Sequence, residues 1–224
     1  MKTFIVIAAY NEGKSIINVI TSLKRHNYNN IVVVDDGSKD NTYDVIKKQK
    51  VYALRHTINR GQGAALKTGI DFALKQGADI IVTFDADGQH LAEDVKNVIR
   101  PVEKGEADAV LGSRFLDKRT EVPFLKKMTL KAGILFTWIF SGIKLTDTHN
   151  GFRALSRKAA QQIRITQDRM EHASEIIDEI HRKKIKFLEV PVKIVYSEYS
   201  KAKGQSIFNS FRIAFKFLLG KLTR

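Results

Sequence analysis

The sequence lacks cysteine and long apolar runs, and its second half has few acidic residues compared with basic ones. Without cysteine, a disulfide framework and thiolate metal sites are excluded. The N-terminal run "TFIVIAA" is too short for a secretory signal, and the run at 132–143 is shorter than the roughly 20 residues that span a bilayer. Residues 114–224 carry 23 basic and 10 acidic side chains, against 15 and 14 in residues 1–113. These features predict a cytoplasmic protein whose second half meets polyanions such as phosphates, anionic lipid or nucleic acid.

Apolar residues make up 43% of the 224 residues, enough for one sizeable core. Apolar runs of strand length alternate with segments whose apolar residues recur at the spacing of a helix. The last of these segments is expected to be interrupted near Pro101. The strands are expected within 3–9, 30–36, 51–56, 78–84 and 107–114, and the helices within 13–26, 41–50, 63–77 and 92–105. Such apolar strands, separated by helices, imply an α/β fold with a parallel sheet covered on both faces. We expect one domain over 1–204 and a basic amphipathic tail at 205–224.

Polar side chains follow four of these strands directly. Because ligands of open α/β sheets bind beyond the carboxyl ends of the strands, these groups are expected at one edge. A single Asp or Ser there would only indicate a loop or a helix cap, but four strand ends converge. The residues are Tyr10, Asn11, Glu12, Asp35, Asp36, Asp85, Asp87 and Arg114.

The segment "TFDADGQH" places Asp85 and Asp87 one residue apart at a strand end. Two carboxylates spaced in this way can direct oxygens toward one hard cation, and Mg²⁺ or Mn²⁺ held so keeps positions open for substrate phosphates. A solvated turn with a helix cap is the alternative. The strand end and the other acidic residues favour the metal site.

Three other functions are weaker interpretations of the same stretches. "DADG" is similar to the nucleophile loop of haloacid-dehalogenase-type phosphatases, but that loop normally ends an early strand. "GQGAAL" begins like a dinucleotide fingerprint, yet Leu66 occupies the third glycine position. Charge alone allows a nucleic-acid module, but no recognised motif or aromatic platform supports one, so we expect no nucleic-acid partner.

A series of motifs carries a family resemblance over residues 3–206. In order they read "AAYNE", "VVVDDGSKDNT", "NRGQGAALKTGIDFA", "FDADGQH", "GSRF", "DTHNGFRALSR" and "EVPVKI". The sequence resembles family 2 glycosyltransferases of the GT-A fold, a Rossmann-like, mainly parallel sheet. Within that family it is similar to polyprenyl-phosphate sugar transferases of the dolichol-phosphate mannose synthase kind.

The resemblance implies a role for each matching residue. The metal motif would be Asp85, Asp87 and Gln89, with Asp87 as the direct ligand. The nucleotide sugar would contact Ala8, Tyr10, Glu12, Asp35, Asp36, the metal motif, Lys201 and Lys203. The acceptor would meet Arg114, Asn150 and Arg153, near Asp147 and Gly151. There are departures: Ala8 replaces a common proline, Lys201 a common arginine, and Ile207 a phosphate-binding lysine.

The nature of the acceptor decides whether a catalytic base is needed. A lipid phosphate is already ionised and needs positioning by Arg114 rather than deprotonation. A sugar hydroxyl would instead need a carboxylate, with Glu171 as first choice and Asp147 as second. Glu171 is equally well interpreted as a first-turn helix residue. His90 is expected to start a helix or support the metal ligands, and His149 is a weaker candidate for a site contact.

The second half supplies two apolar segments that need burial. The segment "MTLKAGILFTWIFSGIKL" predicts a helix that is either buried or lies in a membrane interface. The tail places Phe208, Phe211, Phe215, Leu218 and Leu222 on one face, which suits a helix on an anionic membrane or one docked on protein.

The expected activity is inverting transfer of a sugar from a UDP- or GDP-type donor to polyprenyl phosphate, by an enzyme attached peripherally at the inner membrane face. The alternatives are transfer to a lipid-linked or capsular glycan, and a non-catalytic partner of a membrane complex. A small membrane-protein partner would supply a hydrophobic anchor.

Overall fold

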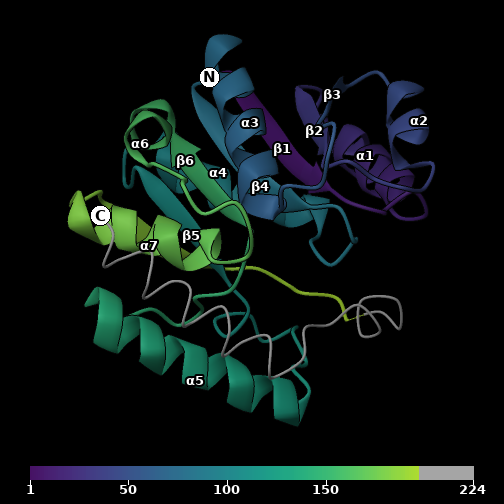
Figure 1. Ribbon diagram of the computed structural model, residues 1–224. Coiled ribbons are helices and arrows are strands. Elements are labelled where there is room, and N and C mark those ends of the chain that lie inside the picture. The colour runs from purple at the N-terminus through teal and green to yellow at the C-terminus, as the bar shows by residue number, and fades with distance from the viewer. Residues whose placement is uncertain (197–224) are drawn as a thin grey trace.

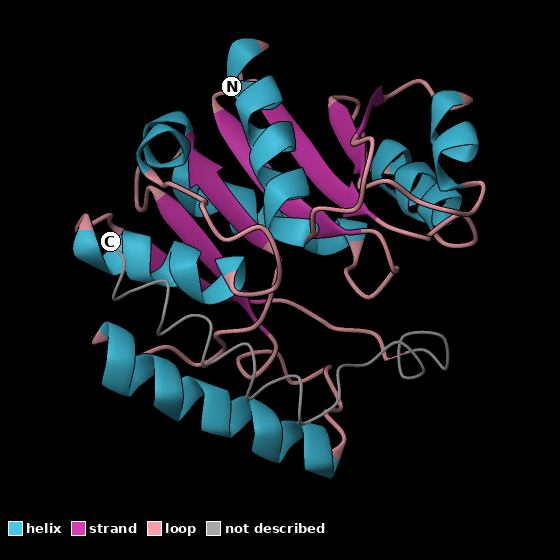
Figure 2. Cartoon of the chain, in the orientation of Figure 1, coloured by secondary structure: helices cyan, strands magenta, loops and turns pink. Residues whose placement is uncertain are grey.

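The apolar runs form the strands of a single sheet in the computed structural model, which describes residues 1–196. The spatial order is β3-β2-β1-β4-β6-β5-β7, and β6 alone runs antiparallel to its neighbours (Figure 2). The α/β class with a mixed, mainly parallel sheet is therefore confirmed. The strands are β1 Thr3–Ala9, β2 Ile31–Asp35, β3 Tyr52–Arg55, β4 Ile80–Asp85, β5 Ala109–Ser113, β6 Arg153–Ser156 and β7 Phe187–Pro191.

Helices cover both faces of the sheet, because its strands are apolar on both sides (Figure 1). One core cluster joins the sheet to α1 (Ile16–Arg25), α2 (Thr42–Lys47) and α4 (Val95–Glu103). The other joins it to α3 (Gln62–Lys75), α6 (Arg157–Gln162) and α7 (His172–Arg182). At Gly69, α3 lies so close to β1 that a Cβ would clash with Val6.

The register of the central strands brings the acidic residues to one edge. Ala9 of β1 is paired with Asp35 of β2, and Ala8 is paired with Asp85 of β4. The carboxyl ends of these three parallel strands are therefore level. This arrangement places the two acidic segments on either side of the end of β1.

Two features of the helices differ from the sequence-based expectation. The expected interruption at Pro101 is wrong, because α4 runs without a break from Val95 to Glu103. A 3₁₀ turn at Ala92–Asp94 precedes the helix. Pro101 is buried, so packing of its ring in the core offsets the one N–H hydrogen bond that proline cannot make within the helix. The helix expected at 41–50 is shorter, Thr42–Lys47.

The apolar segment of the second half forms α5, Phe124–Ser141, which lies beside α7 at the periphery (Figure 1). No helix in the described residues is long and apolar enough to cross a membrane. The tail at 205–224, Lys201, Lys203 and Ile207 lie outside the described residues, and the predictions made for them stay predictions.

Candidate active site

The acidic pair lies at and just beyond the end of β4. Gln89 donates to both Asp87 oxygens, from its backbone N–H to Oδ1 (3.0 Å) and from Nε2 to Oδ2 (2.6 Å). Burial, and next the negative charge of Asp85, raise the pKa of Asp87. Two partly buried carboxylates that repel one another form a place where a cation is favourable.

His90 fixes the orientation of Asp85. Its Nδ1 accepts a hydrogen bond from the Asp85 N–H (3.2 Å), and its Nε2 lies 3.3 Å from Asp85 Oδ2. The ring is buried between Phe84 and Phe152, stacked on the latter with centroids 4.9 Å apart. Of the two expected roles, the geometry favours support of the acidic pair.

The nucleotide side of the edge is formed by Asp35 and Asp36. Asp36 is buried and accepts from the N–H groups of Arg60 (3.0 Å) and Gly61 (2.6 Å), so it holds the loop before α3. Asp35 is fully buried; its Oδ1 accepts from Ser38 N–H, whereas its Oδ2 makes no hydrogen bond within the described residues. Arg55 Nε lies 3.1 Å from that oxygen without hydrogen-bond geometry.

The segment after β1 borders the same region. Tyr10 is partly exposed, whereas Glu12 is buried and its Oε2 accepts from the Ser15 hydroxyl at 2.6 Å. Asn11 adopts a positive φ of 53° and is tied to Ser38, whose hydroxyl accepts from its N–H. Ala8 lies within β1 itself. The expected nucleotide-binding residues 8–12 therefore adjoin Asp35 and Asp36, while their contact with a ligand stays a prediction.

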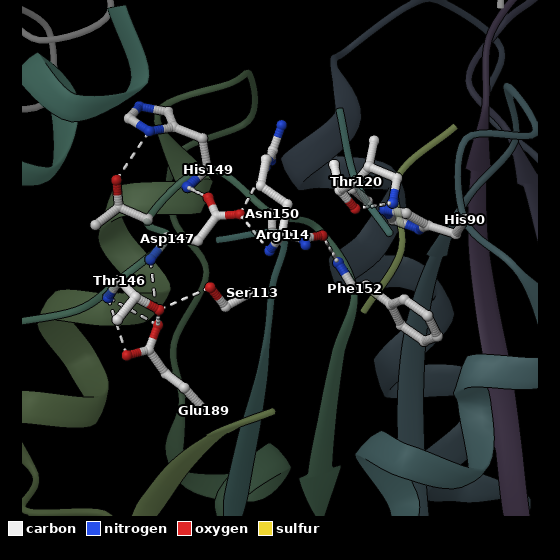
Figure 3. A network of polar contacts seen from close by, with 12 residues as sticks. His90, Ser113, Arg114, Thr120, Thr146, Asp147, His149, Asn150, Phe152 and Glu189 are labelled. Carbon is white, nitrogen blue, oxygen red and sulfur yellow. Dashed lines mark hydrogen bonds and ion pairs between the residues drawn. The ribbon is translucent and has the colours of Figure 1, made fainter. Parts of the chain in front are cut away.

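Arg114 and Asp147 form a buried ion pair (Figure 3). Arg114 donates to Asp147 Oδ2 from Nε at 2.6 Å and from its backbone N–H at 3.1 Å. The loop that carries Asp147 is fastened to β7, where Glu189 accepts from the N–H groups of Thr146 and Asp147. This pairing occupies Asp147, and its role as a base stays a prediction.

Asn150 and Arg153 follow Asp147 closely in sequence, and Gly151 between them lies beside Asp85. Arg153 is buried, and its guanidinium donates to two backbone carbonyls, those of Asn150 (3.2 Å) and Ala173 (3.1 Å). Burial lowers its pKa to about 10, although Asp147 and Asp85 oppose that shift. The buried amide Nδ2 of Asn150 has no hydrogen-bond partner among residues 1–196. The backbone of Gly151 meets Asp85, since a Cβ there would lie 3.1 Å from Oδ1.

The comparisons with known proteins decide the family. The pattern described as "Glycosyl transferase family 2" matches residues 4–164, which is more than half of the chain. The chain belongs to glycosyltransferase family 2. It is therefore a glycosyltransferase, as the motifs predicted.

Two similar proteins cover nearly the whole of this glycosyltransferase. An uncharacterized protein of Methanocaldococcus jannaschii is 41% identical over 98% of the chain and 92% of the relative. A UDP-N-acetylglucosamine–dolichyl-phosphate N-acetylglucosaminyltransferase of Methanococcus voltae is 37% identical over 98% and 96%. An undecaprenyl-phosphate mannosyltransferase of Micrococcus luteus is 33% identical over 69% and 66%. The predicted resemblance to polyprenyl-phosphate sugar transferases is confirmed by the names of these relatives.

Solved structures agree with the fold. Glucosyl-3-phosphoglycerate synthase from Mycobacterium tuberculosis, in complex with phosphoglyceric acid, superposes with a TM-score of 0.75 at 16% identity, over 99% of this chain and 79% of that one. The same synthase in complex with Mn²⁺ and UDP-glucose gives a TM-score of 0.73 over 98% and 78%, also at 16% identity. At this identity the likeness supports the fold alone.

Lys126 and Tyr196 are residues of this glycosyltransferase site that the sequence reasoning missed. Tyr196 accepts a hydrogen bond from Arg114 Nη1 (3.0 Å), and Lys126 Nζ of α5 lies 4.4 Å from the centre of the Tyr196 ring. Burial, and next the charge of Arg114, lower the pKa of Lys126. In the sequence Lys126 was one of several lysines in an apolar helix, and no local signal distinguished it.

Gln62, at the first position of α3, was also missed. Its Nε2 donates to Asp85 Oδ1 at 3.2 Å. The stretch "GQGAAL" fails as a dinucleotide fingerprint, and the family motif that contains it assigns no role to Gln62. Gln62 therefore contacts Oδ1 of Asp85 and His90 contacts Oδ2, so the two oxygens of this carboxylate are held by two separate segments.

Replacing Gln62 with methionine should weaken metal-dependent turnover about 10- to 100-fold, because groups that orient a metal ligand typically contribute that much. The measurement is kcat and KM for the donor over a Mn²⁺ titration. Gln76→Met, at the other end of the same helix, is the matched control. Equal kinetics for both variants would contradict a role for Gln62 in orienting Asp85.

Glu171 precedes α7, whose first residue is His172, and both side chains are buried. His172 Nδ1 donates to the Arg169 carbonyl at 2.6 Å. Burial lowers the pKa of His172 to about 4. The structure thus places Glu171 at the N-cap of α7, and its role as a base stays a prediction.

The low pKa of His172 predicts acid sensitivity. Below about pH 6.5 the His172 imidazole binds a proton in the unfolded chain, whereas in the folded chain this imidazole stays neutral until about pH 4. Unfolding free energy should therefore fall by about 3 kcal/mol as the pH drops through that window. In His172→Asn, whose amide can donate to the same carbonyl, this part of the loss should disappear in urea unfolding followed at several pH values. An unchanged slope would contradict a neutral buried imidazole.

Proposed function

We propose that this glycosyltransferase moves a sugar from a nucleotide-diphosphate sugar, of UDP or GDP type, to polyprenyl phosphate, with Mg²⁺ or Mn²⁺ as cofactor. The product would enter cell-surface polysaccharide or glycan synthesis. The observation that carries the proposal is the meeting of an acidic pair and three cations at one sheet edge. Lys126 lies within electrostatic range of Asp87 and Arg114, and Arg153 lies within range of Asp85 and Asp147.

The residues fit a divalent cation whose coordination is completed by ligand oxygens. In the described chain no three His, Asp or Glu residues gather as a closed metal site. Asp87, Asp85 and Gln89 would hold the ion, which leaves positions for diphosphate oxygens. The raised pKa of Asp87 supports this fit, because a bound cation would relieve the repulsion between the carboxylates. When bound, the ion would neutralise charge on the departing diphosphate.

Two buried atoms that make no hydrogen bond within residues 1–196 fit the ends of the two substrates. Asp35 Oδ2, which lies 3.1 Å from Arg55 Nε, is an acceptor beside the segment expected to meet the nucleotide, and Asn150 Nδ2 is a donor beside Arg153. A buried polar atom left unpaired costs about 1–3 kcal/mol, so a ligand that pairs with Asn150 Nδ2 gains that amount. An N–H group of the donor base would suit Asp35, and an acceptor or sugar oxygen would suit Asn150.

The residues of the chain then position the nucleophile. A phosphate oxygen of the acceptor, ionised at neutral pH, attacks the anomeric carbon while the bond to the nucleotide diphosphate breaks, and the configuration inverts. Arg114 is fixed by Asp147 and Tyr196, and Arg153 by two carbonyls, so both guanidinium groups are preorganised for an anion. No proton must be removed, and therefore no base is required.

The relatives support the choice of acceptor, since two of those compared above are named for transfer to dolichyl or undecaprenyl phosphate. A lipid phosphate acceptor requires the enzyme to work at a membrane. We propose peripheral attachment at the cytoplasmic face.

Incubation with radiolabelled UDP or GDP sugars, polyprenyl phosphate in detergent and Mn²⁺ or Mg²⁺ tests the proposal. A butanol-extractable product that releases its sugar in mild acid is expected, and EDTA should prevent its formation. Product formed only on a glycan hydroxyl, and stable to mild acid, would contradict a phosphate acceptor. Nucleotide binding without turnover on any acceptor would favour a non-catalytic partner.

A further inference from the structure

Helix α5 turns an apolar stripe outward. Its buried positions are Leu130, Thr137 and Ser141, which lie on one side of the helix and face the protein. On the opposite side at helical spacing lie exposed apolar side chains, which are between 51% and 77% exposed. These form the α5 face: Phe124, Met128, Leu135, Trp138 and Ile139. Isolated exposed apolar residues need no explanation, but a contiguous stripe marks an interaction surface.

The charge around the α5 face has one sign. Between residues 122 and 146 the sequence has four lysines and no acidic residue. Lys127 and Lys131 are exposed; at helical spacing Lys131 lies within the stripe, between Met128 and Leu135, and Lys127 lies beside it. Lys144 Nζ lies 5.9 Å from the Trp138 ring centre. An outward apolar stripe with tryptophan and bordering lysines is the composition of a helix that lies in the interface of an anionic membrane.

The inner side of α5 touches the active-site loops. At Gly133 the helix lies so close to His149 that a Cβ would clash with its ring, and this ring is hydrogen bonded to Thr148 (2.8 Å). Lys126 reaches Tyr196, which in turn accepts from Arg114. The helix therefore presents its apolar stripe on one side while its other side contacts the loops that carry Arg114 and Asp147.

We propose that the α5 face lies in the plane of an anionic lipid surface and holds the site against it. The lipid is the occupant that matches both the apolar stripe and the positive border. A second copy of the chain would place the same lysines against one another. The inference deepens the proposed function by naming the surface that meets the membrane, but its test needs no turnover.

Trp138 is the single tryptophan of the chain, so its fluorescence reports on the α5 face alone. The full-length protein is titrated with vesicles of phosphatidylcholine alone or mixed with phosphatidylglycerol. With the anionic vesicles, Trp138 emission should shift to the blue and be quenched by lipids brominated in the acyl chain. Phosphatidylcholine alone should give a much weaker response.

Variants separate the apolar and the charged contributions. Ile139→Glu should weaken vesicle binding about tenfold or more, whereas Ile17→Glu, at an exposed isoleucine of α1, should leave it unchanged. Neutralising Lys127 or Lys131 to Gln should weaken binding about fivefold each in low salt. All four substituted residues are exposed, so circular dichroism should show native folding for every variant.

Three outcomes would overturn the inference. The first is vesicle binding with unchanged Trp138 emission, which would assign attachment to another segment. The second is a shift that depends on protein concentration without lipid, which would assign the α5 face to self-association. The third is no vesicle binding at all. Because the proposed function is tested with acceptor dissolved in detergent, either proposal can fail while the other stands.

Discussion

Asp87→Asn should abolish metal-dependent sugar transfer, with a loss in kcat/KM of about 10²- to 10³-fold or more. The change removes the negative charge that the proposed cation needs while keeping the size of the side chain. Calorimetry with Mn²⁺ and UDP or GDP should show loss of the metal-dependent heat of binding. Asp71→Asn, which removes an exposed carboxylate paired with Lys67, is the matched control and should be neutral in both measurements.

Folding stability distinguishes a functional carboxylate from a structural one in this experiment. The pKa of Asp87 is raised in the folded state, so above that pKa its charge destabilises the fold. Asp87→Asn should therefore unfold at the same or a higher urea concentration than the parent protein in metal-free buffer at pH 7. Transfer activity that survives the substitution would contradict the proposed metal site, and so would a large loss of stability.

Asp147→Asn should have the largest effect on stability, about 3–5 kcal/mol of unfolding free energy. Two of the three hydrogen bonds that fix Arg114 end on one oxygen of Asp147, and the pair is buried. Without the Asp147 carboxylate, the buried Arg114 guanidinium would lose the negative charge that lies 2.6 Å from its Nε. Urea unfolding measures the loss, and transfer assays should show little turnover.

A double variant separates stability from chemistry at this pair. Arg114→Met combined with Asp147→Leu removes both charges, and such apolar replacements of a buried ion pair are often neutral or stabilising. We expect the double variant to regain most of the unfolding free energy but no activity. Recovery of transfer by the double variant would show that Arg114 holds the fold and does not position the acceptor.

Local pattern was sufficient for β1 to β5 and for the acidic pair. The strand cores Phe4–Ala9, Ile31–Val34 and Ile80–Phe84 are apolar apart from Thr83, and buried parallel strands need such runs. Because parallel strands end at one edge, the convergence of Asp35 and Asp85 followed without coordinates, and the register of β1 with both neighbours confirms it. The motif order then predicted the family.

The local sequence pattern did not predict features that depend on burial or on contacts between residues far apart in the chain. Pro101 predicted a break, but the packing of its buried ring offsets the lost hydrogen bond. No strand was predicted at Arg153–Ser156 or at Phe187–Pro191. In the first of these only Ala154 and Leu155 are apolar, so no apolar run of strand length marks it. The burial of Arg153 was likewise invisible in the sequence, where arginine normally indicates a surface.

The sequence by itself determined the fold class, the family and the acidic residues, because each depends on composition and spacing within a short segment. The tertiary structure alone decided which distant residues complete the site. β6 enters antiparallel between β4 and β5, and Asn150 and Arg153 thereby come beside Asp85. Gln62, Lys126 and Tyr196 reach the site from separate elements, since contacts between elements depend on strand order and helix packing, which no local pattern encodes.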